Sequence, residues 1–263
     1  LSSLNIEPGM VERPTHIIWP ETATPFVLDG NDPALRVISQ IIPSKGALLT
    51  GSPRRTVVDK TTVNVWNSLH VVDGSAKIVE TYNKSHLVPF GEYIPFRRYL
   101  DNLTSLTKLT RGRIDFSSGS GKRTLSVPGA PPVSPLICYE VIFSGSVVSN
   151  GKNGALKPEW LLNITNDAWF GVSSGPYQHI AAAQLRAVEE GLPLVRVANT
   201  GISAVIDGFG RIYRESKLNE RTYIDSKLPM SLKEPTIFSK INDVGILLLI
   251  VLIFLLSRFK WCA

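Results

Sequence analysis

Short apolar runs that end in polar residues alternate with amphipathic stretches through most of the chain. Runs of this kind indicate strands, and helical stretches between strands indicate layered α/β structure. The runs that predict strands are residues 16–22, 46–52, 159–167 and 193–199 and the opening of 134–145. We therefore expect an α/β sandwich.

Two further pairs of runs are joined by Asp-Gly, which is typical of β-hairpins. One pair is residues 61–73 and 77–88, and the other is formed by the two halves of 202–213. Residues 33–42 have a helical pattern. A second helix is predicted over 176–191, because proline stands in its first turn, alanines fill it and glycine ends it.

Residues 93–116 differ from this alternation. Large apolar residues recur there every three or four positions, and arginines and lysines occupy the other faces. The pattern predicts a basic amphipathic helix or arm. Two interpretations stay open: an ordinary helix packed on the core, or an arm that lies on a membrane surface or covers a substrate.

The apolar run near the end of the chain has no charge over residues 244–257, and Arg258 and Lys260 follow it. Extended to 241–261 it has 21 residues, roughly 31 Å as a helix, which is enough to cross a membrane. A buried core helix is the alternative. We favour a transmembrane helix because the run is apolar on every side. The basic residues that follow then place the C-terminus in the cytoplasm. Residues 1–235 would accordingly lie on the opposite side of the membrane.

Composition narrows the function classes. The chain has 263 residues, 43% of them hydrophobic, and a net charge of +6. Its basic residues are scattered, so nucleic acid is not an expected partner, and a basic surface facing anionic lipid is the more natural interpretation. The two cysteines, Cys138 and Cys262, form no disulfide framework, and the four histidines lack metal-ligand spacing. We expect no metal site.

We expect residues 1–235 to form one domain, because neither a repeat nor a low-complexity linker interrupts residues 1–228. The first residue is Leu1 rather than Met, and we expect no signal peptide within this sequence. We expect the chain to be a piece of a longer one, with a domain shortened at its N-terminus.

Three polar residues stand where predicted strands or turns end: Glu21, Lys84 and Cys138. Each alone has an ordinary explanation, and a buried cysteine is usually inert. Together they suit acyl transfer. A nearby ammonium group favours the thiolate form of the cysteine and stabilises the oxyanion that forms when the thiolate attacks a carbonyl. A carboxylate within reach can take the thiol proton. Glu92 and Glu140 are further carboxylates that we expect to hold the lysine.

Five strings occur in the order found in the nitrilase (carbon–nitrogen hydrolase) superfamily, which the chain resembles over nearly its whole length. They are "IIWPET", "YNKSHLVPFGEYIPF", "ICYEVIF", "LLNITNDAWFG" and "GPYQHIAAAQLRAVEEGLPLVRVANTGISAVID". Within that superfamily the chain looks most like the bacterial apolipoprotein N-acyltransferases. Full-length members of that group carry several transmembrane helices before the catalytic domain, and only the last span is expected here.

The resemblance implies a nitrilase-like α-β-β-α sandwich with a Glu-Lys-Cys triad. Glu21 matches the general base, Lys84 the electrostatic stabiliser and Cys138 the nucleophile. The positions that match supporting residues of the family are Glu92, Tyr139 and Glu140. The residues expected to line the substrate site are Asn166, Asp167, Trp169 and Phe170, although core packing explains the aromatic pair equally well.

The resemblance also implies the substrates. A phospholipid donates an acyl chain to the cysteine as a thioester, and the α-amino group of a diacylglyceryl apolipoprotein accepts it, without a cofactor. The implied location is the bacterial inner membrane, with the catalytic domain in the periplasm. Two alternatives remain: a membrane-tethered nitrilase-type amidase that hydrolyses C–N bonds, and a binding or scaffold domain without activity.

Overall fold

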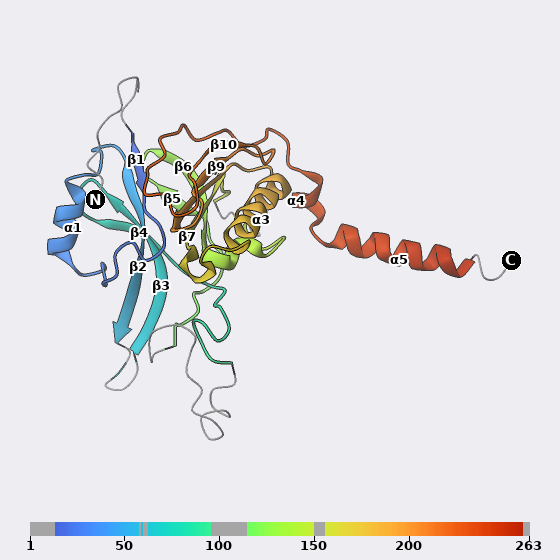
Figure 1. The fold of residues 1–263 in the computed structure, drawn as a ribbon, viewed down its shortest axis with the longest axis horizontal. Coiled ribbons are helices and arrows are strands. Elements are labelled where there is room, and N and C mark those ends of the chain that lie inside the picture. Colours follow the sequence, from blue (N-terminus) through green and yellow to red (C-terminus); the bar gives the residue numbers. More distant parts are fainter. Residues whose placement is uncertain (1–13, 58, 60–62, 96–114, 150–155, 260–263) are drawn as a thin grey trace.

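The computed structural model describes residues 14–57, 59, 63–95, 115–149 and 156–259. Within these ranges the strands form two sheets (Figure 1). The four-stranded sheet runs in the order β1 (His16–Ile18), β2 (Ala47–Val57), β3 (Val63–Asp73), β4 (Ile78–Asn83). The six-stranded sheet runs in the order β10 (Ile212–Glu215), β9 (Ala204–Ile206), β8 (Leu194–Asn199), β7 (Trp160–Asn166), β6 (Ala130–Ile137), β5 (Leu125–Val127).

The helices lie outside the sheets (Figure 1). They are α1 (Asp32–Ser39), α3 (Gly175–Glu190), α4 (Ile237–Ile241), α5 (Val244–Phe259) and two short 3-10 helices, η1 (Cys138–Ile142) and η2 (Asp167–Phe170). Asn31 caps α1 by accepting a bond from the Ala34 amide, and Gly191 ends α3 in the left-handed conformation. The helices predicted over 33–42 and 176–191 are therefore confirmed.

Three apolar clusters hold the layers together. Alternate residues of a strand face opposite sides of its sheet. Leu49 and Val71 accordingly face the second sheet, where they meet residues such as Leu162, and Leu48 and Val72 pack under α1. A third cluster joins the second sheet to α3. The layers follow the order helix, sheet, sheet, helix, which confirms the predicted α-β-β-α sandwich.

Both predicted hairpins are present, but the strand predicted over 77–88 ends at Asn83, and the prediction for β1 also needs correction. β1 ends at Ile18 rather than at residue 22, because Pro20 has no amide hydrogen and the next residues form a turn on β2. The structure also contains β5, which the sequence analysis did not predict. Its three residues pair with β6 and are too few for a recognisable alternation.

The two ends of the predicted arm, 93–95 and 115–116, are described, and residues 96–114 lie outside the described residues. The arm prediction therefore remains open.

The helix α5 extends away from the sandwich (Figure 1). Its described side chains are solvent-exposed on every side, including Leu248 and Ile250. It falls inside the expected span 241–261 but is shorter than that range. No helix in the described part of the chain has both the length and the apolar content needed to cross a membrane.

Candidate active site

Cys138 stands at the carboxyl end of β6, where the strand turns into η1. Its φ is 54°, in the left-handed region that non-glycine residues seldom adopt. Such a backbone persists only where the surroundings hold it, and it is common at reactive residues. The side-chain amide of Asn163 supplies part of that hold, because it donates to the carbonyls of Leu136 and Cys138, at 3.1 Å each.

Lys84 directly follows β4 and is almost completely buried. Its Nζ donates to Glu92 at 2.9 Å and lies 5.4 Å from the centre of the Tyr139 ring. Burial lowers the pKa of Lys84, but the carboxylates of Glu21 and Glu92, together with Cys138 once it is a thiolate, outweigh burial and raise this pKa above its ordinary value. The lysine is therefore a fixed positive charge.

Glu21 lies on the turn after β1 and is also buried. Its carboxylate accepts bonds from the Asn67 side-chain amide at 2.6 Å and from the Asn166 backbone amide at 2.7 Å. Burial raises the pKa of Glu21 above its ordinary value, although Lys84 and Asn67 oppose this. A carboxylate whose pKa is raised is a better proton acceptor than an exposed one.

The turn that carries Glu21 can approach β2 only because Gly51 has no side chain. A Cβ at this position would lie 2.6 Å from the Thr22 nitrogen and 2.7 Å from the Glu21 Cα. Gly51 also donates its amide to the Pro20 carbonyl at 3.2 Å. The glycine therefore fixes where the Glu21 carboxylate lies.

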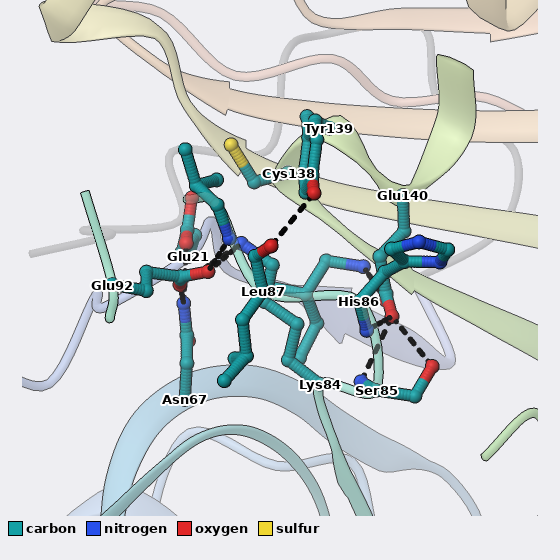
Figure 2. A network of polar contacts seen from close by, with 12 residues as sticks. Glu21, Asn67, Lys84, Ser85, His86, Leu87, Glu92, Cys138, Tyr139 and Glu140 are labelled. Atoms are coloured by element: carbon teal, nitrogen blue, oxygen red, sulfur yellow. Dashed lines mark hydrogen bonds and ion pairs between the residues drawn. The ribbon is translucent and has the colours of Figure 1, made fainter. Parts of the chain in front are cut away.

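Asn67 of β3 and Glu92 join the parts of the site to one another (Figure 2). The Asn67 amide donates to Glu92 at 3.2 Å as well as to Glu21, and the Val88 amide donates to Glu92 at 2.8 Å. Glu92 therefore holds Lys84, as expected. The sequence analysis missed Asn67, because an asparagine in a strand can face either water or the site.

Glu140 does not act as predicted. It was expected to hold Lys84, but its carboxylate lies with Ser85 and His86, away from the sulfur of Cys138 (Figure 2). It is fully buried and accepts bonds from the Tyr82 hydroxyl and from the Ile137 amide, at 2.8 to 3.1 Å. The other donors are the Ser85 amide, the Ser85 hydroxyl and the His86 amide. Glu140 thus ties the segment after β4 to the end of β6.

Tyr139 joins the same two segments. Its hydroxyl donates to the Leu87 carbonyl at 2.7 Å (Figure 2). Its ring also packs edge-on against Phe143, which stacks on His86. Tyr139 therefore places an aromatic face beside Lys84 and restrains the loop that follows it.

The charge state of Cys138 differs from the expectation that the lysine would favour a thiolate. Burial raises the thiol pKa, the Glu21 charge raises it further, and Lys84 lowers it only in part, so that the pKa is about 12. The group is therefore a thiol at neutral pH. It becomes nucleophilic only when a base takes its proton, which is the role expected of Glu21.

The residues expected to line the substrate site have three different placements. Trp169 and Phe170 are 64% and 42% exposed and offer apolar surface. Asn166 holds Glu21 through its backbone, and its side chain caps η2. Asp167 is buried and bonded to Thr165, His179 and Arg196, which favours a positioning role over substrate contact.

The charges of Glu21 and Lys84 both act on the Cys138 thiol, which relates the three predicted triad residues to one another. No group of His, Cys, Asp and Glu in the described ranges is arranged to hold a metal ion.

Comparisons with known proteins support this assignment of fold. The carbon–nitrogen hydrolase family model matches residues 17–237. The protein named apolipoprotein N-acyltransferase from Bradyrhizobium diazoefficiens is 43% identical over 94% of this chain and 45% of its own length. That from Rickettsia prowazekii is 39% identical over 97% of this chain and 49% of its own length. The chain therefore spans about half the length of these curated relatives.

Solved structures agree on the fold alone. A CN-hydrolase superfamily protein from Xanthomonas campestris has a TM-score of 0.52 at 19% identity, over 85% of this chain and 77% of its own. The glutamine-dependent NAD+ synthetase from Acinetobacter baumannii has a TM-score of 0.54 at 16% identity, over 78% of this chain and 37% of its own. Since the family model covers most of its residues, this chain belongs to the carbon–nitrogen hydrolase family.

Proposed function

We propose that the protein is an N-acyltransferase that moves a fatty acyl chain from a membrane phospholipid to the α-amino group of a diacylglyceryl apolipoprotein. The observation that carries this proposal is the combination of a half-buried Cys138, on which the buried Glu21 and Lys84 act, with relatives named apolipoprotein N-acyltransferase. Residues 1–235 would form the catalytic domain, and the reaction would need no cofactor.

The first half of the reaction forms a thioester. Glu21 takes the thiol proton of Cys138, and the sulfur attacks the ester carbonyl of the phospholipid. The oxyanion of the tetrahedral intermediate is stabilised by the Lys84 ammonium. The C–O bond then breaks, Glu21 returns the proton to the leaving oxygen, and a lysophospholipid departs.

The second half transfers the acyl group. Glu21 removes a proton from the acceptor amine as its nitrogen attacks the thioester carbonyl. Lys84 again stabilises the oxyanion. The C–S bond breaks, the sulfur regains its proton from Glu21, and the amide product leaves.

The exposed apolar surface supports a lipid substrate. Trp169, Phe170 and Val172 project from the segment that follows β7, close in sequence to the Asn166 amide that holds Glu21. We propose that this segment receives the acyl chain. We further propose that α5 belongs to a membrane-spanning segment within 241–261, with the catalytic domain on the periplasmic side of the bacterial inner membrane. The all-round apolar surface of α5 supports that placement.

The test of acyl transfer uses membranes that contain the protein, a phospholipid with a labelled acyl chain and a diacylglyceryl lipopeptide. We expect the peptide mass to increase by one acyl chain, and Cys138→Ser to abolish the increase. Release of labelled free fatty acid without peptide acylation would instead indicate a hydrolase. If neither product forms, both the transferase and the hydrolase assignments are contradicted.

The test of membrane placement compares two double variants in flotation with phospholipid vesicles. Leu248→Lys with Leu252→Lys places charge on α5, and we expect it to weaken flotation. Val37→Lys with Val57→Lys changes similarly exposed side chains of the sandwich and serves as the control. Equal flotation of both variants would contradict the placement of α5 in the membrane.

A further inference from the structure

A buried hydroxyl lies behind the nucleophile. In the parallel pairing of β6 with β7, Ile137 is opposite Ile164, so the next residues along the two strands, Cys138 and Thr165, are neighbours. Thr165 is completely buried, and its hydroxyl lies near enough to the Cys138 thiol to lower the pKa of that thiol. A hydroxyl in the interior is costly unless it is bonded. The hydrogen-bond partners of the Thr165 hydroxyl therefore indicate why a hydroxyl stands at this position.

The Thr165 hydroxyl has two possible hydrogen-bond partners, Asp167 and the sulfur of Cys138. It donates to Asp167 Oδ1 at 3.0 Å, and a hydroxyl has only one proton but can also accept. While Cys138 is a thiol, Thr165 can donate to Asp167 and accept from the S–H group. A thiolate can only accept. Once Cys138 has given up its proton, Thr165 satisfies the sulfur only by turning its proton away from Asp167.

Asp167 can lose that bond without becoming unpaired. Its other oxygen accepts from the Arg196 guanidinium at 2.6 Å, and the His179 ring lies 3.0 Å from Oδ1. Burial raises the pKa of Asp167, but the His179 bond and the Arg196 charge outweigh burial and hold this pKa below its ordinary value. Asp167 therefore stays ionised whichever way the Thr165 proton points.

Arg196 reaches Cys138 by two routes. Through Asp167 it acts on Thr165 and the thiol. Through a bond to the Asn163 side-chain oxygen it orients the amide that holds the Cys138 carbonyl. Its Nε also donates to the Ile202 carbonyl at 3.2 Å, so the buried guanidinium has a fixed position. Only a planar group with several donors can hold these acceptors at once.

We propose that Thr165 is a further catalytic residue, whose hydroxyl turns from Asp167 to the sulfur of Cys138 as the thiolate forms, and that Arg196 is the positioning residue behind it. The proton of Cys138 goes to Glu21, and Thr165 keeps its own proton throughout. The same hydroxyl donates again when the thioester breaks and the sulfur leaves as a thiolate. The inference rests on the proposed role of Cys138 as nucleophile.

The test measures the alkylation rate of Cys138 by iodoacetamide against pH, read on the peptide that contains this residue. Thr165→Val keeps the side-chain shape but removes the hydroxyl. We expect alkylation below the thiol pKa to become about tenfold slower, because the thiolate loses a hydrogen bond to a charged group. The curve should move to higher pH, and Thr165→Ser should restore it.

The matched control is Thr50→Val, which removes an equally buried hydroxyl that makes no hydrogen bond. We expect its alkylation curve to match that of the unchanged protein. Thermal unfolding of each variant verifies that Cys138 is alkylated in the folded state. A Thr165→Val curve that coincides with the control, or a Thr165→Ser variant as slow as Thr165→Val, would overturn the proposal.

Arg196→Lys tests the positioning residue. It keeps a positive charge but cannot hold Asn163, Asp167 and Ile202 together. We expect the curve to move in the same direction as in Thr165→Val, and the double variant to move less than the sum of the two shifts. Strictly additive shifts would overturn the link between Arg196 and Thr165. Since alkylation needs neither phospholipid nor acceptor, these results are independent of whether acyl transfer is observed.

Discussion

Glu21 and Glu140 are both buried carboxylates near the same cysteine, yet their surroundings differ. Glu140 accepts bonds from two hydroxyls and three backbone amides. Among the described residues, Glu21 accepts bonds from one side-chain amide and one backbone amide. A carboxylate surrounded by donors anchors the backbone segments that carry those donors. One with few donors in a dry site can take up a proton, because burial disfavours its charge.

The comparison distinguishes a carboxylate that supports the fold from one that takes part in the chemistry, although the two look alike in the sequence. Glu140 connects the segments on which Lys84 and Cys138 stand, whereas the charge of Glu21 acts on the Cys138 thiol. The donors around each carboxylate, more than its burial, therefore indicate whether it supports the fold or the chemistry. The predictions below test this distinction from the largest expected effect to the smallest.

Glu21→Gln removes the base while keeping the shape of the side chain. We expect the rate of acyl-enzyme formation to fall by about a thousandfold, because positioned proton transfer contributes effects of this size. Stability should change little. Rapid-quench measurement of acylated protein, together with thermal unfolding, checks both expectations. Acylation within tenfold of the unchanged protein would assign the base to another group.

Glu140→Gln should affect stability instead. The neutral amide group would face donors that now bond a carboxylate, and breaking such a buried network costs about 3 kcal/mol. Urea unfolding measures the free energy of unfolding. A loss no larger than that in Glu21→Gln would contradict the comparison between the two carboxylates.

Asn67→Ala should shift the pH dependence of acylation. Glu21 must be ionised to accept the thiol proton, so the rate falls as pH drops through the Glu21 pKa. The Asn67 bond lowers this pKa. Its removal should therefore move the acidic limb to higher pH by about one unit. The measurement is the acylation rate against pH, and a limb that stays in place or moves to lower pH would count against Glu21 as the base.

Tyr139→Phe is expected to have the smallest effect. It keeps the ring beside Lys84 but removes the bond to the Leu87 carbonyl. We expect the free energy of unfolding to fall by about 1 kcal/mol. Urea unfolding again provides the measurement. A change above that of Glu140→Gln would show that Tyr139, not Glu140, is the main tie between the two segments.

Much of the fold could be predicted because period-two runs and Asp-Gly turns are local signals. The triad positions were found through family motifs. Asn67, Asn163 and Thr165 were missed because a polar residue inside a strand gives no sign of which face it lies on or which strand lies beside it. Asp167 was expected at the substrate, although the pairing of β7 with β8 places it against Arg196.

The central claim is that Cys138 carries the acyl group. The direct measurement incubates the protein with phospholipid in the absence of acceptor and then determines the mass of the peptide that contains Cys138. We predict one added acyl chain that hydroxylamine removes, present in the unchanged protein and absent from Cys138→Ala. An unmodified Cys138 peptide in protein that still acylates an acceptor, or an acyl group on another residue, would contradict the account.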